Sequence, residues 1–84
     1  MTTPAEYTLL RLPEVLRLRG RSKASHYADI KAGMFPPPVN LGSHCVGWPE
    51  AEVIAVNAAR IAGRSDAEVC GLVRDLVVRR RSIA

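Results

Sequence analysis

The sequence predicts a small, mainly α-helical fold with one β-hairpin, and three observations lead to that prediction. Its 84 residues are enough for a single domain with a single hydrophobic core. Only 5% of the residues are aromatic, so that Leu, Val, Ile and Ala must build most of this core. Glycines and prolines divide the chain into four segments of helical character and one of strand character.

The first two helices are predicted over about residues 13–18 and 22–32. Pro13 fits the first turn of a helix because its missing N–H would have no partner there. Gly20 is expected to end this helix as a left-handed cap, and Ser22 is a good N-cap for the second helix. The spacing fits a DNA-binding helix-turn-helix and an ordinary helical hairpin equally well.

Basic residues around this turn favour the DNA-binding interpretation, because phosphates would meet them first. They are Arg17, Arg19, Arg21 and Lys23. The formal net charge of +4 and the pI near 9.7 also suit a polyanionic partner. Residues 1–35 carry six basic and three acidic residues, and residues 64–84 carry five and three. The positive excess therefore lies in the two end segments of the chain.

The middle of the chain predicts a β-hairpin. Residues 36–38 are all proline, which forbids continuation of the second helix. Residues 39–41 and 45–48 then fit two short strands around the turn at 42–44, a hairpin of the size of a wing. So short a hairpin is marginal by itself and must pack on the helices. Trp48 is the expected anchor.

Two further helices are predicted, one from Pro49 to Gly63 and one after Ser65. Ser65 and Glu68 have the spacing of a capping box, and an apolar stripe follows. The stripe consists of Val69, Leu72, Val73, Leu76 and Val77. It either completes the core, which we favour, or docks on a neighbouring molecule. The basic run 79–81 is either a solvated helix end or an arm that contacts phosphates.

The sequence disfavours an enzyme or a membrane protein. It holds no nucleophile with a placed histidine and acid, no paired carboxylates in an apolar setting and no glycine-rich phosphate loop. No catalytic residue, metal or cofactor is therefore expected. Cys45 and Cys70 are expected to be buried reduced thiols. No apolar run is long enough to span a bilayer, so we expect a cytoplasmic, nucleoid-associated protein with no membrane partner.

An ordered series of short motifs gives the chain a family likeness that extends from about residue 9 to residue 77. The motifs are LRLPEV at 10–15, the segment 22–33 with HYADIKAG, Phe35, PPV at 37–39, LG at 41–42, VGW at 46–48, NAARIAG at 57–63 and SD at 65–66. In this order they resemble the AlpA-type prophage regulators. The resemblance implies a winged helix-turn-helix, as in MerR-type regulators and in excisionases. We expect this domain over residues 9–63, with the C-terminal helix and basic tail, 64–84, packed on it.

The resemblance also implies that the second helix enters the major groove of double-stranded DNA while the wing follows the backbone or the minor groove. The candidate DNA contacts are Arg19, Arg21, Ser22, Lys23, Ser25, His26, Tyr27 and Lys31 in the helix-turn-helix, with Ser43 and His44 in the wing. Three of them have plainer interpretations. His26 fits a surface helix residue as well as a base reader, Tyr27 fits the core, and Lys31 complements the helix dipole.

Four positions depart from the family's pattern. His44 stands where relatives often have arginine, and a neutral imidazole cannot replace that charge in a narrow minor groove. Pro36 stands where relatives often have threonine. Ala28 and Asp29 replace an Arg-Leu pair, which removes one possible phosphate contact and adds a charge expected to repel DNA.

The resemblance is compatible with two roles on DNA, and of these we favour an excisionase, that is, a recombination directionality factor of a prophage or integrative element. The alternative is a transcriptional regulator of an integrase or excision gene, and a protein-interaction module is a weaker third. One module of this size reads few bases. We therefore expect head-to-tail self-association on repeated DNA sites, bending of that DNA, and an integrase as a possible partner.

Overall fold

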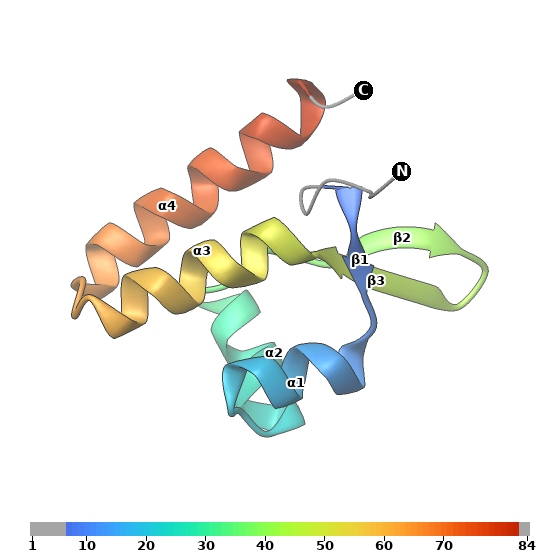
Figure 1. Ribbon diagram of the computed structural model, residues 1–84, viewed down its shortest axis with the longest axis horizontal. Coiled ribbons are helices and arrows are strands. Elements are labelled where there is room, and N and C mark those ends of the chain that lie inside the picture. Colours follow the sequence, from blue (N-terminus) through green and yellow to red (C-terminus); the bar gives the residue numbers. More distant parts are fainter. Residues whose placement is uncertain (1–6, 83–84) are drawn as a thin grey trace.

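The structure, a computed structural model that describes residues 7–82, confirms a mainly helical fold with a small antiparallel sheet (Figure 1). Its elements in chain order are β1 (Leu9–Leu10), α1 (Leu12–Arg19), α2 (Lys23–Lys31), β2 (Val39–Gly42), β3 (Cys45–Pro49), α3 (Glu50–Ile61), α4 (Asp66–Arg79) and a 3₁₀ turn, η2 (Arg80–Ser82). The architecture is compatible with a winged helix-turn-helix. In Figure 1, α1 and α2 lie together, the β2–β3 hairpin projects to one side, and α3 and α4 run side by side.

The sheet has the strand order β1-β3-β2, with β3 in the centre. The predicted hairpin is confirmed, but β1 was not expected. It pairs with the end of β3, where Leu10 faces Trp48. Gly47 allows the strands to approach closely, because a Cβ there would lie 2.9 Å from the side chain of Leu41 and 3.1 Å from the backbone oxygen of Leu10.

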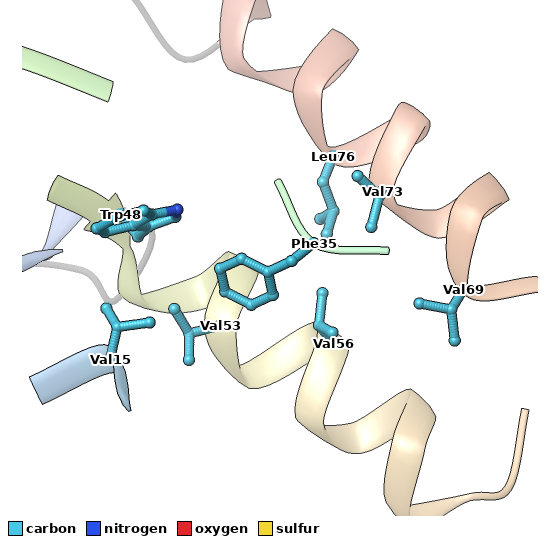
Figure 2. Packing of buried hydrophobic residues seen from close by; sticks show 8 residues of the cluster. All are labelled: Val15, Phe35, Trp48, Val53, Val56, Val69, Val73 and Leu76. Carbon is cyan, nitrogen blue, oxygen red and sulfur yellow. The ribbon is translucent and has the colours of Figure 1, made fainter. Parts of the chain in front are cut away.

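The core is formed by five valines and one leucine around two aromatic rings (Figure 2). Its buried members are Val15, Phe35, Trp48, Val53, Val56, Val69, Val73 and Leu76. Figure 2 shows Phe35 with side chains of α3 on one side and of α4 on the other. Trp48 is fully buried and its Nε1–H donates a hydrogen bond to the backbone oxygen of Pro36 at 3.0 Å, as expected of an anchor.

The apolar stripe of α4 contributes to this core, as favoured from the sequence. Val69, Val73 and Leu76 are buried in it, and Leu72 packs against it. The capping box is also confirmed, since Ser65 accepts from the backbone N–H of Glu68 while the Glu68 carboxylate accepts from that of Ser65.

Several boundaries differ from the expected ones. The first helix begins at Leu12, one residue before Pro13, and its last residue is Arg19, while Gly20 caps it with a left-handed φ of 65° as expected. Pro49 is the last residue of β3 and the N-cap of α3 rather than its first helical residue.

Cys45 and Cys70 are free thiols but only half-buried, so the expectation that they are buried is wrong. Within residues 7–82 there is no cluster of metal-ligating side chains and no helix long and apolar enough to cross a membrane.

Candidate nucleic-acid interface

The turn between α1 and α2 is closed by hydrogen bonds at both helix ends. The backbone N–H groups of Gly20 and Arg21 both donate to the carbonyl oxygen of Leu16, at 2.9 and 3.2 Å. Ser22 then caps α2, because its hydroxyl oxygen accepts from the N–H of Ser25 at 3.2 Å. The Ser22 hydroxyl also donates to the Ser25 hydroxyl at 3.1 Å. Both serines, predicted as DNA contacts, therefore build the start of α2.

One side of α2 is open to solvent. Its exposed residues are Lys23, Ala24, Tyr27, Ala28 and Lys31, which follow helical spacing and so form one stripe. We call this stripe the α2 outer face. Tyr27 is 39% exposed, so the expectation that it packs in the core is wrong. The two alanines were not predicted as site residues, although their spacing relative to Lys23 and Tyr27 places them on the same stripe.

His26 is not a surface residue. It is fully buried, and its ring lies 5.2, 5.0 and 4.9 Å from the rings of Tyr27, Phe35 and Trp48. Burial of the ring, together with the nearby positive charge of Arg19, lowers the pKa of His26 to about 4. Both interpretations of His26 from the sequence, as a surface residue and as a base reader, are therefore wrong, because the imidazole belongs to the core.

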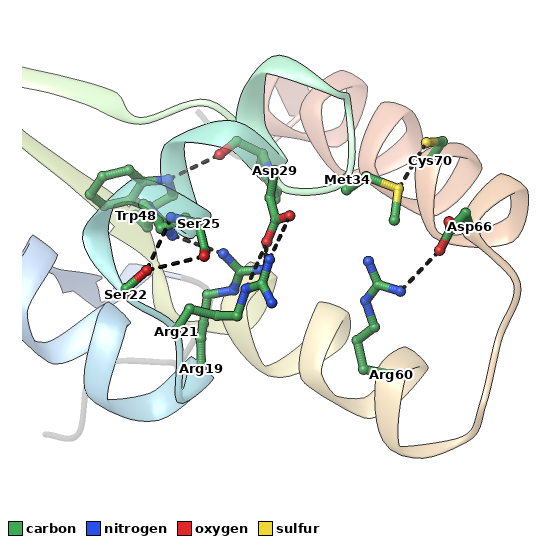
Figure 3. Close-up of polar contacts among 12 residues, drawn as sticks. Arg19, Arg21, Ser22, Ser25, Asp29, Met34, Trp48, Arg60, Asp66 and Cys70 are labelled. Carbon is green, nitrogen blue, oxygen red and sulfur yellow. Dashed lines mark hydrogen bonds and ion pairs between the residues drawn. The ribbon is translucent and has the colours of Figure 1, made fainter.

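Two arginines converge on Asp29 (Figure 3). Arg19 Nη2 donates to Asp29 Oδ2 at 2.8 Å, and Arg21 donates to both carboxylate oxygens, from Nε at 3.1 Å and from Nη2 at 2.9 Å. The Arg19 side chain is only 4% exposed, and its guanidinium carbon lies 3.9 Å from the centre of the Phe35 ring. Arg19 is thus a buried structural cation and not the phosphate contact that was expected.

The same cluster corrects the expectation for Asp29. Its carboxylate does not face DNA as an unpaired repulsive charge, because it is held between Arg19 and Arg21. The side chain of Arg21 remains 44% exposed. The cluster therefore presents one accessible guanidinium, that of Arg21, held at Asp29 of α2.

The predicted wing contacts lie at the tip of the hairpin. Ser43 and His44 are both exposed, and His44 has a left-handed φ of 57°, which places it in a tight turn. Arg11, which the sequence did not single out, belongs to the same region. Its Nε–H donates to the backbone oxygen of Val46 at 3.0 Å while the residue stays exposed. An arginine therefore stands where the wing meets the helices.

The basic run at the end of α4 is partly structural. Arg80 pairs with the buried carboxylate of Glu52, at 2.9 Å from Nε and 2.6 Å from Nη2, and donates to the backbone oxygen of Pro37 at 2.8 Å. Arg79 and Arg81 are exposed. The interpretation of the whole run as a free arm does not hold for Arg80, because its guanidinium is used to connect α4 with α3.

Comparisons with known proteins place the chain beside prophage proteins. Residues 8–55 match the family described as "Prophage CP4-57 regulatory protein (AlpA)". The chain is also 51% identical over 55 residues to the uncharacterized protein ORF88 of Enterobacteria phage P4, a match that covers 66% of this chain and 62% of the length of that relative. No solved structure matches the chain. The family match includes α1, α2, the whole sheet and the start of α3.

Proposed function

Because this chain belongs to the AlpA family of prophage regulatory proteins, we propose that it is a prophage regulator that binds double-stranded DNA in a sequence-specific manner. The observation that carries the proposal is the α2 outer face. The helix is fixed from behind by buried His26 and by the Arg19–Asp29 pair, and its other side is unobstructed. A rigid helix with one open side is what a major groove accepts.

The chemistry of the α2 outer face suits contact with both bases and phosphates. Lys23 and Lys31 bring positive charge at its two ends, and Tyr27 offers a ring with a hydroxyl group. Ala24 and Ala28 are small, so the helix backbone can lie deep in the groove and their methyl groups can contact thymine methyls. The free backbone N–H groups at the start of α2 also favour a phosphate.

The β2–β3 hairpin is the second contact in this proposal. Its exposed tip carries Ser43 and His44, and Arg11 lies at its base with its side chain hydrogen-bonded to Val46. We assign the phosphate contact of the wing to Arg11, because its guanidinium group is always charged. In this arrangement residues 9–63 carry the DNA contacts, and α4 supports them from the core.

Among DNA-binding prophage proteins we favour a recombination directionality factor. Its copies would bind repeated sites head-to-tail and bend the DNA, and an integrase would act on the bent DNA. The use of α4 supports head-to-tail contacts rather than a two-fold dimer. Val69, Val73 and Leu76 of its apolar stripe are buried in the core and are not free to form a coiled coil. On α3, by contrast, Ile54 and Ile61 are 52% and 87% exposed and lie two turns apart on one side, a surface available to a neighbouring copy. Transcriptional control of an integrase or excision gene is the alternative.

The test of DNA binding is a salt series. Binding of a fluorescent duplex is measured from 50 to 300 mM salt for the wild type, for Lys23→Ala and for Arg74→Ala, an exposed arginine of α4. We expect the logarithm of the affinity to fall steeply with the logarithm of salt in the wild type. Lys23→Ala should lower that slope by about one unit on specific and random DNA alike, and Arg74→Ala should leave it unchanged. Salt-independent binding by the wild type would contradict the proposal.

Cooperativity is tested by titration of DNA with one, two and three sites, together with a circular-permutation bending assay. A directionality factor should fill adjacent sites together and retard the permuted fragments unequally. Independent filling without bending would favour the transcriptional alternative.

A further inference from the structure

A polar hollow of about 370 Å³ lies where the turn between α1 and α2 meets α3. Arg19, Arg21, Asp29, Asn57 and Arg60 line it. Three of these side chains are positive and one is negative, so the hollow carries an excess of two positive charges. Since one water occupies about 30 Å³ of the liquid, the hollow has room for a tetrahedral anion with several waters.

The positive charges in this hollow repel one another. Burial lowers the pKa of Arg19, the bond to Asp29 raises it, and the charges of Arg21 and Arg60 lower it again. An anion placed between the exposed guanidinium groups would relieve that repulsion and would be held by charge-assisted hydrogen bonds.

Two of the three guanidinium groups can reach such an anion. Arg21 uses Nε and Nη2 for Asp29, and its side chain is 44% exposed. Arg60 Nη1 pairs with Asp66 Oδ1 at 3.2 Å, but the Asp66 side chain is 80% exposed, and such surface pairs contribute little. In Figure 3 the side chain of Arg60 extends from α3 on the side where Arg21 and Asp29 lie.

We propose that this hollow binds a backbone phosphate of DNA between the α1–α2 turn and α3, with Arg21 and Arg60 as its ligands, and that Asp29 is the positioning residue for Arg21. The proposal rests on the proposed DNA-binding function and assigns it a phosphate site outside the α2 outer face. A two-point bond from Asp29 fixes the plane of the Arg21 guanidinium, and Asp29 is itself fixed by buried Arg19. The chain of contacts thus extends from the core to the exposed edge of Arg21.

Arg60→Ala is the first test, with Arg64→Ala as its matched control. The two arginines stand one helical turn apart in sequence, and each is exposed and forms one ion pair with an acidic residue of α4. Arg64 does not line the hollow. We expect Arg60→Ala to weaken DNA binding about tenfold and to lower the salt slope by about one unit, and Arg64→Ala to change the affinity less than twofold. Equal effects of the two variants would overturn the proposal.

Arg21→Lys and Asp29→Asn test the positioning role. Arg21→Lys keeps the charge but cannot hold both oxygens of Asp29 in a planar fork, so we expect DNA binding to weaken about fivefold. Asp29→Asn removes a negative charge, so simple electrostatics predicts stronger DNA binding. If Asp29 positions Arg21, the same substitution should instead weaken DNA binding. Its melting temperature is measured in parallel, since Arg19 loses its ionised partner. If Asp29→Asn does not fold, the DNA affinity of Arg21→Lys tests the positioning role. Wild-type DNA affinity of Arg21→Lys would overturn it.

Inorganic phosphate, titrated into the ¹⁵N-labelled protein at constant ionic strength, separates the two sources of the anion. We expect no saturable shifts of the side-chain signals of Arg21 and Arg60 at millimolar phosphate. Saturable shifts together with wild-type DNA affinity of Arg60→Ala would assign the hollow to free phosphate and overturn the proposal. A wild type whose DNA binding does not depend on salt would refute the proposed function itself, whereas steep salt dependence with equal Arg60→Ala and Arg64→Ala would refute only this inference.

Discussion

The Nδ1 atom of His26 lies 2.8 Å from Nη1 of Arg19. A guanidinium group can only donate hydrogen bonds, so Nδ1 must accept, and the neutral ring carries its proton on Nε2. Nε2 is buried and has no hydrogen-bond partner within residues 7–82. A second proton would have to be placed on Nδ1, against the positive charge of Arg19. The geometry therefore fixes His26 as a neutral histidine inside the core.

This arrangement predicts that the protein loses stability in mild acid. The folded state holds the pKa of His26 at about 4, below its ordinary value of 6.5. As the pH falls from 6.5 to 4, the unfolded chain takes up this proton and the folded protein does not. The free energy of unfolding should therefore fall across this window, by up to about 3 kcal/mol. Urea denaturation at pH 7.5, 6, 5 and 4.5 measures the effect, and a flat profile contradicts it.

Two variants assign this loss to one side chain. His26→Phe removes the titrating group and should flatten the profile between pH 6.5 and 4.5, whereas His44→Gln in the exposed hairpin tip should keep the wild-type profile. Two carboxylates whose pKa is lowered by hydrogen bonds change charge at a pH below this window. The hydrogen bond from Arg17 lowers the pKa of Glu14, and that from the backbone of Ser65 lowers the pKa of Glu68, both from 4.5.

The pair of Arg80 with Glu52 predicts a large difference between two adjacent arginines. The Glu52 side chain is 6% exposed, so Arg80→Ala leaves a buried carboxylate without its partner and should cost about 3–5 kcal/mol. Arg81→Ala alters an exposed side chain and should change stability by less than about 0.5 kcal/mol. Chemical denaturation of both variants checks this, and equal stabilities would show that the pair contributes nothing.

A second matched pair tests the role of α4. Val73 is buried in the core and Val78, on the same helix, is 68% exposed. Val73→Asp places a charge among apolar side chains and should abolish cooperative unfolding, whereas Val78→Asp should keep the wild-type melting temperature within a few degrees. If Val73→Asp melted like the wild type, the stripe would be an intermolecular surface instead of part of the core.

The elements of this fold that have local signals could be predicted from the sequence. The left-handed end at Gly20, the N-cap at Ser22 and the capping box at Ser65 depend on residues within one or two turns, and all three are confirmed. The strand β1 could not be predicted in this way. Its two residues pair with the end of β3 about 40 positions away, and two leucines followed by Arg11 carry no alternating pattern.

The interior side of α2 was misjudged for a different reason. It is polar, because His26 and Asp29 point inward and both form hydrogen bonds with Arg19 across the turn. Apolar periodicity identifies core-facing positions only where these are apolar, so the inward histidine and aspartate were interpreted as surface residues. Helical spacing alone places Ala24 on the same side of α2 as Lys23 and Tyr27, although an alanine has no charge or ring that indicates a DNA contact.

The α2 outer face is tested most directly by mapping DNA onto the protein with NMR. A ¹⁵N-labelled sample is titrated with a duplex selected from a random pool, and backbone amide shifts are followed along the chain. The account predicts saturable shifts along α2, centred on Ala24, Tyr27 and Ala28, together with shifts at the tip of the β2–β3 hairpin. Shifts confined to α4 and the exposed end of α3, with α2 unchanged, would contradict it.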